Sequence, residues 1–105
     1  MHFRKDEWIG SRWPSIDIEP MDQTLFFRVL IYLTVTYNFP MPRIIDTIDG
    51  YAADFEISDC IATLSIDAYM FSLAFQESEV RDQVLAGLLA LPDTFFDDPE
   101  NQASG

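Results

Sequence analysis

The sequence predicts an α+β fold in which an early helix and a C-terminal helix pack on one face of a small antiparallel sheet. Three observations predict it: an apolar run of helical length before Phe39-Pro40-Met41-Pro42, apolar and polar alternation between Tyr51 and Phe75, and a second helically spaced run that ends before Pro92. Elements of these two kinds pack as layers around one core.

Length and composition favour a single domain. The chain has 105 residues, of which 49% are hydrophobic and 14% aromatic, so it can bury enough apolar surface to offset the entropy lost on ordering. We expect one globular domain over residues 1–95, followed by an acidic, mobile tail over residues 96–105.

The first twenty residues have a loop-like composition with aromatic anchors. Trp8 and Trp13 occur here together with Pro14 and Pro20. Within this segment, apolar and polar residues alternate from Ser15 to Glu19, which predicts a short strand.

The segment Met21 to Asn38 fits two periods. Alternation from Phe27 to Tyr37, rich in β-branched residues, is typical of a strand. Helical spacing is equally present, and Asp22 is placed to cap a first turn with Pro40 just beyond the end. The apolar positions at helical spacing are Phe26, Val29, Leu30, Leu33 and Tyr37. A strand of this length exceeds the usual range, so length favours the helix.

After the prolines, the segment from Arg43 to Ile48 is interpreted as a short helix that Asp49-Gly50 ends.

From Tyr51 to Phe75 the alternation predicts two or three antiparallel strands, with turns near Ser58-Asp59 and Asp67-Ala68. The stretch from Asp59 to Gln76 also matches helical spacing. A helix there would make the protein an all-α bundle, and this alternative stays open.

The last predicted element is a helix that Ser78 caps and Pro92 closes, with Arg81 placed to pair with Glu77. Its apolar positions are Val80, Val84, Leu85, Leu88 and Leu91.

Charge is the strongest global signal. Six Lys and Arg stand against eighteen Asp and Glu, which gives a net charge of −12. A field of this sign repels nucleic acid and anionic lipid and attracts a basic partner. The single cysteine, Cys60, fits a reducing compartment, and the apolar run from Leu25 to Tyr37 is too short to span a bilayer. We expect a cytoplasmic protein that binds neither nucleic acid directly nor membrane.

Catalytic and metal-binding chemistry is disfavoured. The one histidine, His2, lies near the terminus, and Cys60 has no neighbouring Lys or His to activate its thiol, which predicts a small buried apolar residue. The acids from Asp46 to Asp59 do not match a calcium loop, and no glycine-rich phosphate loop occurs. We therefore expect no enzyme activity, no cofactor and no metal.

Acidic residues dominate the middle of the chain, where eight acids and no Lys or Arg occur between Ile44 and Val80. A one-signed surface of this kind, with aromatic anchors, predicts a site for a basic protein. The predicted partner-binding residues are Asp46, Asp49, Tyr51, Asp54, Glu56, Asp59, Asp67 and Tyr69. Trp8 and Trp13 are further candidate anchors, and Phe95-Phe96 is interpreted as a tether of the tail to the core.

The run Asp54-Phe55-Glu56-Ile57, the strand-like stretches Ile61–Ile66 and Tyr69–Phe75, and the helix Val80–Leu91 ending in Leu91-Pro92 resemble the body of a small bacterial immunity protein. Such proteins occur beside contact-dependent growth inhibition toxins and nuclease bacteriocins. The resemblance implies a cytoplasmic inhibitor that binds one cognate toxin tightly, often a basic nuclease domain.

Two other functions stay open. One is an acidic secretion chaperone or adaptor, which an obligate dimer would support. The other is a nucleic-acid mimic, whose acids should lie at phosphate-like spacing along one face.

Overall fold

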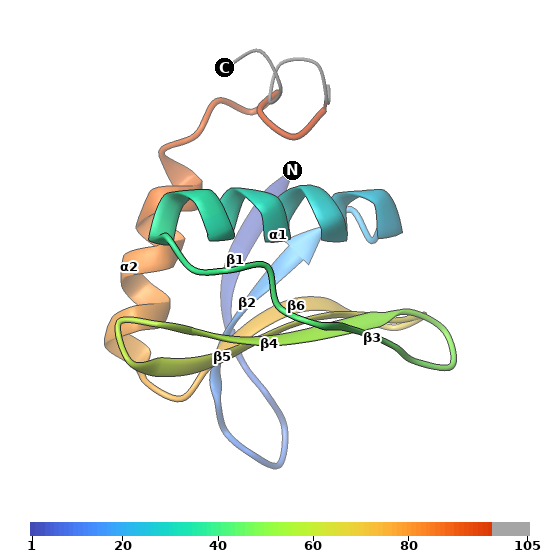
Figure 1. Cartoon of the computed structure of the whole chain (residues 1–105), viewed down its shortest axis with the longest axis horizontal. Coiled ribbons are helices and arrows are strands. Elements are labelled where there is room, and N and C mark those ends of the chain that lie inside the picture. The colour runs from blue at the N-terminus through green and yellow to red at the C-terminus, as the bar shows by residue number, and fades with distance from the viewer. Residues whose placement is uncertain (98–105) are drawn as a thin grey trace.

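The computed structural model describes residues 1–97 and confirms the α+β prediction (Figure 1). Two helices pack on an antiparallel six-stranded sheet with strand order β1-β2-β6-β5-β4-β3. The elements in chain order are β1 His2–Glu7, β2 Pro14–Glu19, α1 Gln23–Tyr37, β3 Ile44–Asp46, β4 Tyr51–Ile57, β5 Cys60–Ile66, β6 Phe71–Phe75 and α2 Ser78–Leu89.

Helix α1 confirms the helical interpretation of the early apolar run. Asp22 caps it as expected, because its side chain accepts a hydrogen bond from the backbone N–H of Thr24. The helix ends at Asn38, which adopts the left-handed conformation. One face of α1 is buried against the sheet through Leu25, Phe26, Val29, Leu30 and Leu33.

Strands β4, β5 and β6 form the predicted antiparallel meander, so the all-α alternative is wrong. Both Ser58 and Asp59 have positive φ, as a tight two-residue hairpin turn requires, and this turn sets the register in which Ile57 faces Cys60. Alternate residues of β4 and β5 are buried. Cys60 is one of them and is 1% exposed, which confirms its prediction as a buried apolar residue.

The helix predicted from Arg43 to Ile48 is wrong, because this segment contains β3, which pairs with β4. Thr47 and Gly50 close the connection through a hydrogen bond from the Thr47 N–H to the Gly50 carbonyl oxygen. At Gly50, a Cβ would lie 1.7 Å from the Ile66 carbonyl oxygen, so only glycine fits beside β5. Asp49-Gly50, predicted to end a helix, therefore belongs to the turn between β3 and β4.

The loop expected for the first residues is also corrected. Residues 2–7 form β1, whose six residues pair in register with β2 from Pro14 to Glu19. Strand β1 is an edge strand, so most of its side chains are exposed and it lacks the apolar alternation of a half-buried strand. His2 lies in this strand.

Helix α2 differs from its prediction at the first turn. Glu77 is the N-cap residue and makes no side-chain capping bond, whereas Ser78 is the first helical residue. The expected ion pair of Arg81 with Glu77 is wrong, because the Arg81 guanidinium instead pairs with Asp82 at 2.6 Å and turns toward the sheet.

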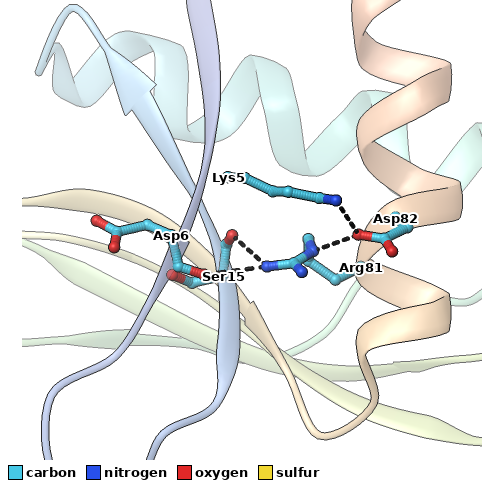
Figure 2. Close-up of polar contacts among 5 residues, drawn as sticks. All are labelled: Lys5, Asp6, Ser15, Arg81 and Asp82. Atoms are coloured by element: carbon cyan, nitrogen blue, oxygen red, sulfur yellow. Dashed lines mark hydrogen bonds and ion pairs between the residues drawn. The ribbon is translucent and has the colours of Figure 1, made fainter.

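The Arg81 guanidinium joins α2 to the β1–β2 ladder (Figure 2). Its Nη1 donates to the backbone oxygens of Asp6, at 3.0 Å, and Ser15, at 3.2 Å. Lys5 adds an exposed ion pair with Asp82 at 3.4 Å. These contacts place the second helix over the half of the sheet that α1 leaves uncovered.

The last described residues fold back onto the core. Phe96 is 2% exposed and packs edge-on against Phe3 and Tyr32, while Arg28 donates a hydrogen bond to the Phe96 carbonyl oxygen. The Phe95-Phe96 tether is thereby confirmed. The remainder of the predicted tail, residues 98–105, lies outside the described residues. Of the two helices described, neither has the length and apolarity needed to cross a membrane.

Candidate protein-binding face

The sheet has one face covered by the helices and one turned away from them. We call the second the outer face. Figure 1 shows the β1–β2 loop, residues 8–13, on the side of the sheet opposite α1. Strand alternation directs Asp17 of β2, Thr63 of β5, and Asp54 and Glu56 of β4 toward the outer face, since their neighbours along each strand are buried in the core.

Two tryptophans lie at the centre of the outer face. Trp8 Nε1 donates to the hydroxyl oxygen of Ser72 at 2.6 Å, and Ser72, in β6, is fully buried. The Trp8 and Trp13 rings stack with centroids 6.2 Å apart and an interplanar angle of 10°. The Trp8 N–H donates a hydrogen bond to the Trp13 carbonyl oxygen and closes the loop between them. Arg12 and Gly10 in this loop have positive φ. We call Trp8 and Trp13 the tryptophan pair.

A shallow hollow lies on each side of the tryptophan pair. The hollow beside Trp8 is lined by the carboxyl-bearing residues Asp6, Glu7 and Asp17. The hollow beside Trp13 is lined by Asp54 and Glu56, with Ile61 adding apolar surface. The outer face thus combines an aromatic centre with flanking carboxyl groups.

The carboxyl groups beside Trp8 interact with each other. Partial burial raises the pKa of Asp17, and a hydrogen bond with Asp6 raises it further. The same hydrogen bond lowers the pKa of Asp6, as does the bond from the Glu7 N–H. Asp17 also faces Arg4, whose Nη2 lies 3.3 Å from Asp17 Oδ2. Asp6 and Asp17 are therefore held together beside the exposed guanidinium of Arg4.

The carboxylate of Asp54, beside Trp13, is oriented by β5. Thr63 Oγ1 donates to Asp54 Oδ1 at 2.6 Å, across a directly opposed pair of the two strands. Both Asp54 and Glu56 are exposed. This hollow therefore presents carboxylates to solvent beside an indole ring.

Two of the eight predicted site residues, Asp54 and Glu56, lie together on the outer face. Asp59 lines a second hollow with these two at one end of the sheet, and Asp46, Asp49 and Tyr51 line a hollow at the other end. Asp46 and Asp49 flank the β3–β4 connection, at the same end as the β5–β6 turn with Asp67 and Tyr69, because Tyr51 pairs with Ile66. Asp59 lies at the opposite end, in the turn between β4 and β5.

Two of the predicted residues have structural roles. Tyr51 is half-buried and packs against Phe26 and Phe27 of α1, with ring centroids 5.7 and 5.0 Å apart, on the helix side of the sheet. Asp67 accepts the backbone N–H groups of Tyr69 and Met70 and so stabilises its own turn. Tyr69 itself is 88% exposed at the tip of that turn.

Sequence reasoning named the tryptophans as candidate anchors but missed the acids that accompany Trp8. Asp6, Glu7 and Asp17 come to this face because β1 pairs with β2. A hairpin closed by Trp8 and Trp13 would have predicted them, because it places Asp6 opposite Ser15 and Arg4 opposite Asp17. These four residues then point to one face of the hairpin.

Within residues 1–97, no group of three or more His, Cys, Asp or Glu side chains converges to hold a metal ion. No protein-family model, curated protein or solved structure matches the chain. The geometry of the outer face is therefore the basis for the functional proposal.

Proposed function

We propose that this chain is a non-enzymatic inhibitor of the immunity type, which binds a basic cognate toxin domain through the outer face of its sheet and occludes it. The observation that carries the proposal is the tryptophan pair between two carboxyl-lined hollows. A nuclease domain fits best, because the cleft that holds its phosphate-bearing substrate presents basic side chains.

The chemistry of the outer face suits Arg and Lys side chains. An indole face attracts a guanidinium or ammonium group through its quadrupole, by about 0.5–2 kcal/mol depending on desolvation. Asp54 and Glu56 lie beside Trp13, so a basic group over that ring also meets charge-assisted acceptors. Aromatic anchors surrounded by polar groups are the usual arrangement of binding hot spots.

The net charge of −12 supports fast association with such a partner. Complementary long-range fields raise association rates and lose their effect as salt is added. The outer face supplies the short-range contacts and the whole surface supplies the steering.

The distribution of acids favours a protein partner over a role as a nucleic-acid mimic. On the outer face the acids are divided into two groups by the tryptophan pair, and Asp17 is paired with Arg4. A mimic needs a continuous line of negative charge in place of this aromatic centre. The secretion chaperone or adaptor remains the alternative if the protein retains unfolded clients.

The test is an affinity pull-down from the lysate of the native cell with the tagged full chain. It compares the wild type with Asp54→Asn/Glu56→Gln, which removes two charges from the outer face. The matched control is Glu77→Gln/Glu79→Gln, which removes two exposed charges at the start of α2. We expect the wild type and the control to retain one basic protein in equal molar amount at low salt, and the outer-face variant to lose it.

Purified partner then allows a direct measurement. The chain contains only the two tryptophans of the outer face, so its intrinsic fluorescence reports this site. We expect binding to change that fluorescence and to abolish the partner's nuclease activity. Retention of the partner by the outer-face variant at wild-type level would overturn the assignment of the face, and an active partner in the complex would overturn the inhibitor role.

A further inference from the structure

Helix α1 carries a row of exposed apolar side chains on the side opposite its buried face. Phe27, Ile31 and Val35 follow one another at every fourth position, and they are 36%, 48% and 76% exposed. Residues four apart lie one above the other on a helix, so the three side chains form a continuous row. We call it the α1 row.

The α1 row lies in the longest acid-free part of the chain. No Asp or Glu occurs from Gln23 to Ile45, whereas eighteen occur in the whole sequence. The charged residues of this stretch are Arg28 and Arg43, and the Arg28 guanidinium is bound to the Phe96 carbonyl oxygen. The row therefore lies on a helix that offers apolar contact and has no carboxylate of its own.

We infer that the α1 row is the interface of a homodimer, in which a second copy of this chain packs its own α1 row across it. Two copies with a charge of −12 repel each other in every orientation, and they repel least when they approach through a segment without acids, as the row does. A basic partner gains nothing from it, because it offers no carboxylate. Residues 98–105 have the sequence Asp-Pro-Glu-Asn-Gln-Ala-Ser-Gly, without a large apolar side chain that would cover it.

The row is self-complementary about its centre. With the two helices crossed about a twofold axis at Ile31, Phe27 of each copy meets Val35 of the other. The helix of fifteen residues is about 22 Å long, so the shared area is smaller than the roughly 800 Å² per partner of a standard interface. Each chain has a complete core of its own, and we expect a dimer in exchange with folded monomers.

The dimer is compatible with the proposed function and independent of it. The α1 row belongs to a helix on one side of the sheet, whereas the β1–β2 loop, which the tryptophan pair flanks, lies on the opposite side (Figure 1). A dimer would present two outer faces pointing apart. Its test uses the purified chain alone and gives the same answer whether or not a basic partner exists.

The experiment is sedimentation velocity of the full chain over a range of concentrations, at about 0.01 M and about 1 M NaCl, where the Debye length falls from about 30 Å to about 3 Å. The variants are Ile31→Glu and Val35→Glu. The matched control is Ile48→Glu, a fully exposed isoleucine in the β3–β4 connection. We expect the wild type and the control to dimerise more strongly at high salt, and each α1 variant to raise the dimer Kd by about tenfold or more.

A second measurement locates the twofold axis. Cys60, the single cysteine, is buried, so an introduced cysteine is the accessible thiol under mild oxidation. We expect Ile31→Cys to form an intermolecular disulfide and Ile48→Cys to remain monomeric under the same conditions. The inference is overturned by a wild-type chain that stays monomeric at every concentration and salt level, or by α1 variants that dimerise as well as the control.

Discussion

The hydrogen bond from Trp8 to Ser72 holds the loop of residues 8–13 against the sheet. The Ser72 hydroxyl is fully buried on the outer face of β6 and would lack this partner if the loop moved away. Leaving a buried polar group unpaired costs more than the bond itself contributes, so this one contact orients the tryptophan pair.

We expect Trp8→Phe to lower the free energy of unfolding by about 1–2 kcal/mol, because the buried Ser72 hydroxyl loses its donor. Removing both partners in Trp8→Phe/Ser72→Ala should cost less than the sum of the two single changes. Urea unfolding of the four chains measures this double-mutant cycle. Strict additivity would show that the bond does not hold the loop.

The raised pKa of Asp17 can be tested through the pH dependence of folding stability. Burial and the bond with Asp6 raise its pKa in the folded chain above the ordinary 3.8, so the folded state binds more protons between the two values. The contribution of Asp17 to stability therefore rises as pH falls through its raised pKa, because the charged form is disfavoured in the folded chain. The lowered pKa of Asp6 contributes with the opposite sign, so the comparison needs a variant of Asp17 alone.

We expect Asp17→Asn to unfold at a higher temperature than the wild type at pH 7, because Asn keeps a donor for Asp6 without a second charge. The gain should shrink as pH falls toward 3.8. Thermal unfolding of both chains across this range checks the prediction, and a difference that grows on acidification would contradict it.

At the scale of elements, Arg81 determines how α2 sits on the sheet. Its side chain is 11% exposed, and it donates to backbone oxygens of two different strands while pairing with Asp82 (Figure 2). A guanidinium can serve three acceptors at once because its donors point in fixed directions. One side chain thereby joins the second helix to the β1–β2 hairpin that carries the tryptophan pair.

We expect Arg81→Met to lower the free energy of unfolding by about 2 kcal/mol, mostly through the two charge-assisted bonds to backbone oxygens. Met retains the apolar stem of the side chain. Lys5→Met is the control, because its ion pair with Asp82 is exposed and should change stability little. Equal losses in the two variants, measured by urea unfolding, would contradict a specific role for Arg81.

In the whole molecule, repulsion among the acidic side chains opposes the compact folded state. Eighteen acids repel one another across a chain of 105 residues, while three ion pairs connect cations to acids within the described residues. Self-repulsion of this kind lowers the stability of the folded state and is relieved by salt.

We expect the thermal midpoint to rise when NaCl is raised from about 0.01 M to about 0.15 M, where the Debye length falls from about 30 Å to about 8 Å. The thermal midpoint of Glu77→Gln/Glu79→Gln should rise less, because this variant carries two fewer negative charges. KCl should act like NaCl if screening is the cause. A midpoint that falls with salt would show that the ion pairs outweigh the repulsion.

Elements with local signals could be predicted from the sequence alone. Asp22 capped α1 where its position indicated, Ser58-Asp59 turned the chain between β4 and β5, and Cys60 was buried as its neighbours indicated. These features depend on side-chain period and on turn chemistry, which act over a few residues. Other features have no such local signal: β1 and β3 are edge strands with mostly exposed side chains, and Glu77 rather than Ser78 is the N-cap of α2. Arg81 pairs with Asp82 and with backbone oxygens of the sheet rather than with Glu77, through contacts between segments far apart along the chain.

The same division holds for the candidate site. Composition and spacing identified Asp54, Glu56 and the tryptophans as residues able to bind a basic partner. The same signals also predicted one site that includes Asp46, Asp49, Asp59, Asp67 and Tyr69. In the structure these residues lie at the two ends of the sheet, and Tyr51 packs against α1. Which acids share a face depends on strand register and on the order of strands in the sheet. Contacts between segments far apart along the chain set both, and no local pattern records them.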